Sequence, residues 1–390
     1  MSPSLSRLSP FSLLLLLFVA SISAQTPAQP QDTAPAFKGE IQVREVGLVI
    51  EPPENGLFKP EDLLVFEGGA PRQVLKAEPL RPEKGSHPWN VVLYFDRALA
   101  GPETARGAAL ALARQAGRLT GLGTVEVAVA DPEPRVELAA TVDAAGLSDA
   151  LGAIAEQARK SLPPPSRPSK QQAAATATTT APTLRRQLDR LTAFLAGPPG
   201  HSAGSGARAL FLVVDGFVPP PGEADLISAE DTGDPAPPGT ATAALRATSR
   251  LLAAGGWITF AMPFRATAPS REERAQNDMD RIRVQGGGSE HTNSAPPVIP
   301  MRGSGGGPLR HTSVADVFTA PESAPLMALV QPTAGTVLGV EEQLRPAIDG
   351  LARRWRVWYQ APEPAGDKLR SVEVRLPGAA TPLRCPRWVG

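Results

Sequence analysis

Two aspartates stand at positions where an α/β sheet commonly presents groups that bind a ligand. Asp96 ends a run of apolar, β-rich residues that begins at Trp89, and a helical pattern follows it. Asp215 ends a second strongly apolar run, residues 209–214. The carboxyl ends of parallel strands meet at one edge of a sheet, where α/β proteins bind their ligands. We therefore expect both carboxylates at that edge, although a terminal Asp is by itself ordinary in a parallel sheet.

Other residue types that carry catalytic chemistry have no partners at the required spacing. The histidines lie in loop-like sequence without an HxH or HExxH pattern, which argues against a zinc or catalytic role. These histidines are His87, His201, His291 and His311. Cys385 is the only cysteine, so no internal disulfide can form, and we interpret it as a small apolar residue. Since no nucleophile–base pair is visible, we expect a protein that is not an enzyme, and a hydrolase ranks last among the alternatives.

The overall composition leaves no net charge for electrostatic steering. The chain carries 39 basic and 39 acidic residues, a formal net charge of +0. A neutral protein has no net field that attracts nucleic acid, so we expect no nucleic-acid partner. The 43 prolines and 36 glycines indicate that much of the chain outside the core is turn or linker.

The N-terminus is typical of a signal peptide. Arg7 supplies a positive charge, residues 13–19 are apolar, and the small residues up to Ala24 offer a cleavage point near residue 24. The apolar stretch is shorter than the ~20 residues that a membrane-spanning helix needs. We therefore expect a secreted or periplasmic protein without an integral membrane segment after cleavage of residues 1–24.

The rest of the chain divides into ordered parts and low-complexity segments. A Pro-rich insertion at 161–182 interrupts the central α/β part. The expected parts are a disordered tail at 25–38, a small β unit at 39–82, an α/β domain at 88–264, a disordered loop at 265–311, and the last helices with a C-terminal β element at 312–390.

Hydrophobic periodicity predicts the elements within these parts. In the β unit, a strand at 63–67 is expected to turn at Gly68 and Gly69 and to return through 73–75 as a hairpin. In the α/β domain, strands alternate with helices, as in a parallel sheet. The expected strands are 90–95, 125–129, 136–138, 209–214 and 257–262, the expected helices are 103–118, 147–160, 184–196 and 241–254, and a helix at 341–353 precedes strands at 355–359 and 371–376.

The order of several short motifs indicates a family. The β unit contains KPEDLLVFEGGAPRQV, the α/β part contains LAATVDAAGLSDALGAI, LFLVVDGF and AAGGWITFAMPF, and SVEVRL lies near the end of the chain. In this order the chain resembles the bacterial von Willebrand factor type A-related proteins of the acidobacterial kind, over most of residues 40–390. The resemblance implies a Rossmann-like α/β fold, in which helices flank a mostly parallel sheet, with a small N-terminal β unit and a C-terminal β element.

The resemblance also implies a set of residues for a metal-ion-dependent adhesion site. In type A domains this site joins an Asp-x-Ser-x-Ser loop, a threonine and a later aspartate around a divalent cation. Carried over to this chain, Asp96 matches the first aspartate, Thr141 the threonine and Asp215 the later aspartate. Ala98 and Ala100 stand where the family has its two serines. The implied site is therefore degenerate.

The two alanines change what the site is expected to do. Mg²⁺ requires tight geometry from its oxygen ligands, and two hydroxyl ligands are missing here. Arg97 lies between the alanines. In place of a metal we expect either a pairing of its guanidinium with Asp96 or Asp215 or a site filled by solvent. We therefore expect no metal cofactor, with Mg²⁺ or Ca²⁺ as the alternative.

These observations favour an exported, non-enzymatic binding protein. It would recognise a protein partner in the envelope or extracellular space through the loops around Asp96, Thr141 and Asp215. The alternative is a structural or scaffolding envelope protein in which the Pro-rich insertions are the interaction segments.

Overall fold

The structure is a computed structural model that describes residues 43–53, 59–82, 87–162, 181–197, 206–215, 240–264, 324–362, 368–379 and 381–390. The predicted signal peptide, the tail, the loop at 265–311 and residues 163–180 of the Pro-rich insertion lie outside these ranges, as do His201, His291 and His311. The scaffolding alternative rests mainly on those segments. Within the described ranges, no helix has the length and apolar character to cross a membrane.

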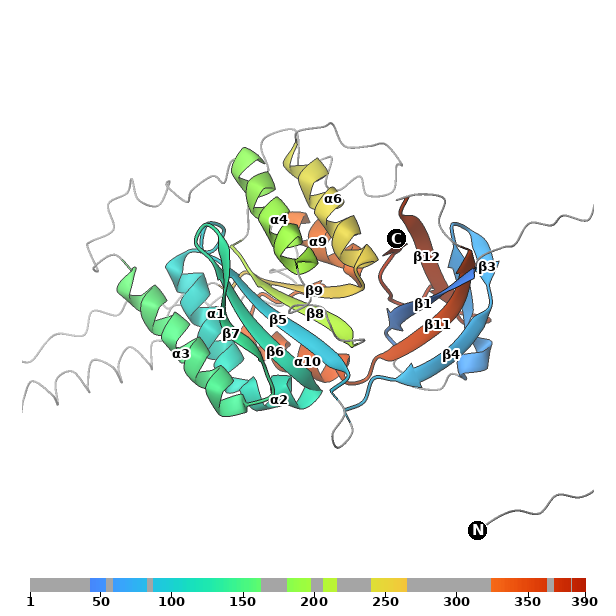
Figure 1. The fold of residues 1–390 in the computed structure, drawn as a ribbon, viewed down its shortest axis with the longest axis horizontal. Coiled ribbons are helices and arrows are strands. Elements are labelled where there is room, and N and C mark those ends of the chain that lie inside the picture. The colour runs from blue at the N-terminus through green and yellow to red at the C-terminus, as the bar shows by residue number, and fades with distance from the viewer. Residues whose placement is uncertain are drawn as a thin grey trace, which may run out of the picture. The chain divides into compact units, whose positions relative to one another are not determined.

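A six-stranded sheet with the order β10-β9-β8-β5-β6-β7 forms the centre of the fold (Figure 1). Its neighbouring strands are parallel, except that β7 is antiparallel to β6. The strands are β5 (Trp89–Asp96), β6 (Gly123–Ala130), β7 (Pro134–Thr141), β8 (Ala207–Val213), β9 (Trp257–Met262) and β10 (Thr336–Val337). The predicted α/β class with a mostly parallel sheet is confirmed, and the arrangement is consistent with a type A-like fold.

Helices cover both faces of this sheet, which explains why its inner strands are apolar at nearly every position. Alternate residues of β5 point to opposite sides: Leu93 joins the core under one helix layer, and Tyr94 joins the core under the other. The first layer comprises α1 (Pro102–Arg114), α2 (Ala116–Leu122), α3 (Ala144–Lys160) and α10 (Leu344–Leu351); the second comprises α4 (Ala181–Ala196), α6 (Ala241–Ala254) and α9 (Ala324–Val330) (Figure 1).

Local signals explain where several of these helices begin. The Asp143 carboxylate accepts hydrogen bonds from the backbone N–H groups of Ala145 and Gly146 at the start of α3, and Thr240 caps α6 in the same way. The single helix predicted at 103–118 is two helices in the structure, α1 and α2, because Gln115 leaves helical geometry with φ −102 and ψ 7. Short 3₁₀ turns span Pro60–Asp62, Gln331–Thr333 and Glu341–Gln343.

The N-terminal β unit and the C-terminal β element together form two further antiparallel sheets. Their orders are β1-β11-β4 and β13-β12-β2-β3, so each sheet contains strands from both parts of the chain. The two sheets share one apolar core that includes Ile50, Val65 and Tyr359. The strands are β1 (Val43–Ile50), β2 (Leu64–Glu67), β3 (Ala70–Arg72), β4 (Val74–Pro79), β11 (Trp355–Pro362), β12 (Arg370–Arg375) and β13 (Trp388–Val389).

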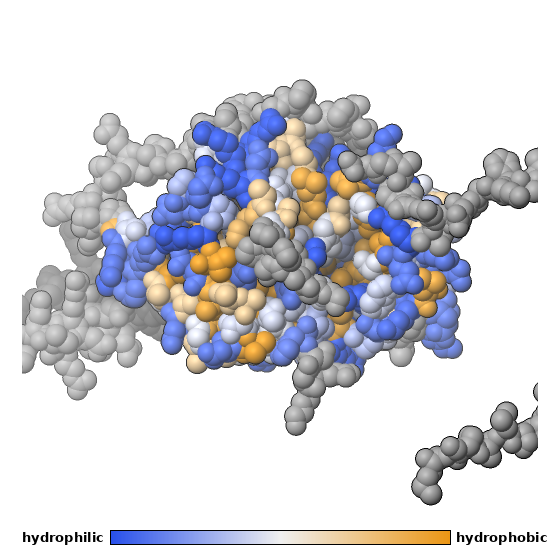
Figure 2. All heavy atoms as spheres, in the orientation of Figure 1, coloured by the Kyte–Doolittle hydropathy of each residue, from blue (hydrophilic) through white to orange (hydrophobic). Residues whose placement is uncertain are grey.

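The hairpin predicted in the β unit has a different second strand. Gly68 and Gly69 form the turn with φ of 58 and 79, values that glycine adopts readily. The strand that returns is β3, whereas the predicted return at 73–75 lies mainly in β4, which pairs with β11 in the other sheet. On the face drawn in Figure 2, hydrophilic side chains predominate among the described residues, and the hydrophobic ones gather in small groups.

Candidate functional site

The carboxylate of Asp96 is buried at the carboxyl end of β5 and organises the turn that follows. Its side chain is 1 % exposed. Its Oδ1 atom accepts hydrogen bonds from the backbone N–H groups of Ala98, at 3.0 Å, and Leu99, at 3.1 Å. The Asp96 carbonyl also accepts a bond of 2.7 Å from the N–H of Ala100. One residue thus holds the conformation of the whole turn.

Asp215 joins the same turn from the neighbouring strand. It follows β8, which pairs in parallel with β5. Its backbone N–H donates to the carbonyl of Leu99 at 2.8 Å, and its Oδ2 atom accepts from the N–H of Gly101 at 2.7 Å. The structure therefore brings Asp96 and Asp215 together at the carboxyl edge of the sheet, where the sequence placed them. We call residues 96–101 together with Asp215 the carboxyl-edge turn.

Burial controls the ionisation of this site. It raises the pKa of Asp96 from 3.8 to about 6, against the opposing effect of the two backbone hydrogen bonds and of the positive charge on Arg190. Burial also raises the pKa of Tyr94 above its ordinary range, and the nearby Asp96 charge adds to that effect. A carboxylate with its pKa near 6 changes its charge within the pH range in which the protein would work.

The predicted pairing of Arg97 with Asp96 or Asp215 is wrong. The guanidinium of Arg97 binds the carboxylate of Asp131 at 3.0 Å, in the turn that joins β6 to β7. The backbone explains the choice, because the Arg97 N–H donates to the carbonyl of Ala130, which directly precedes Asp131. Arg97 therefore contacts the end of β6 at the point where the chain leaves β5.

A second ion pair near this edge was not anticipated from the sequence. Arg190 of α4 lies 2.7 Å from the carboxylate of Glu133, in the same β6–β7 turn. In the sequence, the acidic residues Asp131 and Glu133 follow directly after the β6 strand, where a turn is expected. This was the only indication of a charged group at this place. Arg190 gave no such signal, because its place is fixed by the packing of α4 on the sheet.

The assignment of Thr141 to this site requires a correction. Thr141 pairs with Val125 near the start of β6, whereas Asp96 pairs with Ala130 at its end. Five residues of strand separate these positions, or about 16 Å at ~3.3 Å per residue. The reason is that β7 runs antiparallel to β6 and carries the chain back to the opposite edge. There the Thr141 hydroxyl accepts a hydrogen bond of 3.0 Å from the N–H of Asp143.

The donor set does not fit the cation site that the family resemblance implies. Ala98 is exposed and Ala100 is buried, and neither side chain has an oxygen to offer. One oxygen of each aspartate already accepts hydrogen bonds from backbone N–H groups. An Mg²⁺ ion that bound these oxygens would have to replace those hydrogen bonds. Among the described residues, no group of three or more His, Cys, Asp or Glu side chains could hold a metal ion.

Cys385 lies in the interior and away from this edge. It is 6 % exposed, within the core shared by the two antiparallel sheets. Burial raises the pKa of its thiol from 9.0 to about 12. Because the thiolate is the reactive form, this environment suppresses nucleophilic chemistry. His87 is exposed in the loop before β5.

Comparisons with known proteins found distant similarity to solved structures and no family. No family model matches the chain, and none of the curated proteins matches it. Among solved structures, the conserved hypothetical protein BatB from Bacteroides thetaiotaomicron is similar at 12 % identity and a TM-score of 0.30, over 68 % of this chain and 98 % of that one. An aerotolerance-related membrane protein from Bacteroides fragilis NCTC 9343 is similar at 14 % identity and a TM-score of 0.28, over 67 % and 98 %.

The three N-terminal domains of the type V pili tip protein Mfa5 from Porphyromonas gingivalis are also similar. The identity is 13 % and the TM-score 0.19, over 44 % of this chain and 25 % of that one. These values carry no functional argument. The description of the fold therefore rests on the sheet order and strand directions given above.

Proposed function

We propose that this chain is an exported, non-enzymatic protein of the von Willebrand factor type A-related kind, which binds a protein partner through its carboxyl-edge turn without a divalent metal. The observation that carries the proposal is the double anchoring of this turn by Asp96 and Asp215. The aspartates hold backbone in place, so the turn has a defined shape without a cation.

A fixed turn on a rigid sheet is a suitable recognition surface. Loops that a packed scaffold holds in position carry binding function in many folds, because little conformational entropy is lost when they bind. Ala98 stands exposed at this turn, while its neighbours Leu99 and Ala100 are buried beneath it. A partner would thus meet the small side chain of Ala98 on a backbone that is already ordered.

The charges beside the turn suit a polar rim. The Arg97–Asp131 and Arg190–Glu133 pairs lie at the same edge of the sheet and are partly exposed. Protein interfaces commonly combine an apolar centre with a polar rim, and charges in the rim set orientation and partner choice. We therefore expect binding to weaken with increasing salt concentration.

The experiment that tests this function is a pair of matched substitutions. Ala98→Arg places a long charged side chain on the proposed surface, and Ala140→Arg places the same side chain on β7, near the opposite edge of the sheet. Both alanines are exposed, so neither change disturbs a core. Affinity capture from an envelope extract is quantified by mass spectrometry. The wild type and Ala140→Arg should capture one discrete partner, and Ala98→Arg should not capture it. Equal capture by both variants would overturn the proposal.

A metal titration tests the second half of the proposal. A ligand that binds only the folded protein raises its melting temperature by mass action. We expect the melting temperature of the wild type to be the same in millimolar MgCl₂ or CaCl₂ as in EDTA. We also expect EDTA to leave partner capture unchanged. A metal-dependent rise that the Asp215→Ala variant lacks would show that the turn holds a cation after all.

A further inference from the structure

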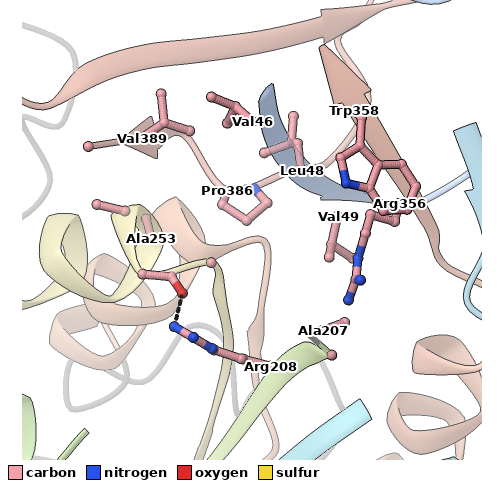
Figure 3. Close-up of a pocket in the computed structure, with 16 residues that line it drawn as sticks. Val46, Leu48, Val49, Ala207, Arg208, Ala253, Arg356, Trp358, Pro386 and Val389 are labelled. Atoms are coloured by element: carbon pink, nitrogen blue, oxygen red, sulfur yellow. Dashed lines mark hydrogen bonds between the residues drawn. The ribbon is translucent and has the colours of Figure 1, made fainter. Parts of the chain in front are cut away.

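A second candidate site lies along the free edge of strand β1, far from the carboxyl-edge turn. β1 stands at one side of the sheet β1-β11-β4 and, among the described strands, pairs only with β11. A cavity of about 300 Å³ lies between β1 residues 46–49 and the residues at the amino ends of β8 and β9 (Figure 3). This volume is at the lower end of the range for ligand sites, ~300–1,000 Å³. We call it the β1-edge cavity.

Backbone hydrogen bonds show which residues of β1 direct their N–H and C=O groups away from β11. In an antiparallel pair, these groups point alternately toward the partner strand and away from it along the chain. The N–H of Glu51, directly after β1, donates to the carbonyl of Arg384 at 2.8 Å and therefore points away from β11. The same alternation directs the backbone groups of Gly47 and Val49 outward, where no described residue forms a hydrogen bond with them.

The pairing of β11 supports the same assignment. The carbonyl of Arg354 accepts a hydrogen bond of 2.8 Å from the N–H of Leu80, so Arg354 points toward β4. Arg356, two residues on, has the same direction and lies opposite Val49. Val49 is 6 % exposed and lines the cavity, so its outward groups face a partly enclosed space. Polar backbone groups at such a position require water or a ligand as a partner.

One wall of the β1-edge cavity is apolar. It is formed by side chains of β1 and of the C-terminal segment that lie close together in Figure 3: Val46, Leu48, Pro386 and Val389. Arg208 also lines the cavity, but its guanidinium is directed at the carbonyl of Gly255, at 3.0 Å. A ligand in this space therefore meets two outward pairs of backbone groups with an apolar surface beside them.

We propose that the β1-edge cavity binds a short extended peptide segment of a partner protein, which adds to β1 as a further strand. The outward groups of Gly47 and Val49 are two residues apart, about 6.6 Å at ~3.3 Å per residue, and an extended peptide repeats its own groups at the same interval. The peptide residue opposite Leu48 directs its side chain to the same face of the sheet as Leu48, so we expect it to be apolar. The proposal is independent of the function assigned to the carboxyl-edge turn.

Isothermal titration of the full chain with capped pentapeptides tests this proposal. Acetyl-Ser-Ala-Leu-Ala-Ser-amide should bind saturably. The same peptide with Asp in place of Leu should bind at least about tenfold more weakly, because its carboxylate would leave water for an apolar wall. Equal affinity of the two peptides, or binding of neither at millimolar concentration, would overturn the proposal.

Methylation of the peptide nitrogens distinguishes strand addition from other ways of filling the cavity. In the proposed pairing, the N–H groups of the two alanines point to β1 and that of the leucine points away. A methyl group on either alanine nitrogen should weaken binding about tenfold or more, because it removes a backbone hydrogen bond and adds bulk against β1. A methyl group on the leucine nitrogen should change the affinity by less than about threefold. Equal losses at all three positions would contradict strand addition.

Proline substitutions on β1 locate the binding. Gly47→Pro removes an outward N–H and places a ring in the cavity, so it should abolish peptide binding. Glu45→Pro is the matched control, because position 45 has the same outward direction and is exposed but does not line the cavity. It should leave the affinity unchanged. Equal peptide binding by the two folded variants would place the peptide elsewhere and refute the assignment.

Amide hydrogen exchange, followed by NMR, tests the edge in the wild type without any substitution. The amides of Gly47 and Val49 should exchange faster than that of Leu48, which points toward β11. Saturating Leu peptide should slow the exchange of Gly47 and Val49. Exchange of both that is already slow in the free chain would mean that another segment of the chain covers this edge, and the site for a partner would be refuted.

Discussion

Replacing Asp96 with Asn should change how the stability of the protein depends on pH. The Asp96 carboxyl is buried, and its pKa is about 6 in the folded protein against an ordinary value of 3.8. Between these two pH values the folded protein holds a proton that the unfolded chain has released. By linkage, the free energy of unfolding therefore falls as the pH rises through this window.

The magnitude follows from the separation of the two pKa values. They differ by about 2, and each pH unit corresponds to ~1.4 kcal/mol, so the ionised carboxylate costs the folded protein about 3 kcal/mol above pH 6. Asn at position 96 retains an oxygen that can accept the N–H groups of Ala98 and Leu99 and carries no charge. We expect the difference in unfolding free energy, Asp96→Asn minus wild type, to rise by about 2 kcal/mol between pH 4 and pH 7, because part of the unfolded-state titration lies below pH 4.

The assay is urea unfolding of both proteins at several pH values from 4 to 8, monitored by tryptophan fluorescence, with the slope against urea required to stay constant. The difference between the two proteins cancels the titration of all carboxyl groups that they share. A difference that does not change with pH would refute the inferred burial of the charge. A difference of opposite sign would mean that a cation or an unrecognised donor stabilises the ionised form, and the account of a metal-free turn would fail with it.

Three other changes test particular contacts. Asp215→Ala removes the acceptor of the Gly101 N–H and should cost ~1–2 kcal/mol in urea unfolding, whereas an unchanged midpoint would show that this contact does not stabilise the turn. Gly335→Ala would place a Cβ atom 1.6 Å from the backbone oxygen of Thr259, so it should destabilise by ~4 kcal/mol or more, and a soluble variant of normal melting temperature would contradict this packing. Cys385, with a thiol pKa of about 12, should react with a thiol reagent at pH 8 only after unfolding, and rapid labelling of the folded protein would show that it is accessible.

Much of the fold was accessible from local sequence patterns. The strand at 257–262 and the helix at 241–254 have the same bounds in the structure as in the prediction, because period and capping residues are short-range signals. The element at 324–330 was not predicted, since seven residues are too few for a helical period to stand out. The two short strands β10 and β13 were missed for the same reason.

The candidate site was accessible only in part. Asp96 and Asp215 could be placed because each follows its own strand, and parallel strands share a carboxyl edge. Thr141 was misplaced because the direction of β7 depends on its pairing with β6, which no local pattern encodes. Arg97 was given the wrong partner because its two candidates and Asp131 are all acidic residues at strand ends.

By itself, then, the sequence determined the alternation of strands and helices, the apolar character of both sheet faces and the presence of a carboxylate after β5 and β8. These features depend on residues that are close in the chain. Only the tertiary structure decided that N-terminal and C-terminal strands share two sheets, that the two aspartates hold one turn, and that Arg208 and Arg356 line one cavity. Residues far apart in the chain meet through strand register and helix packing, and those depend on the whole core at once.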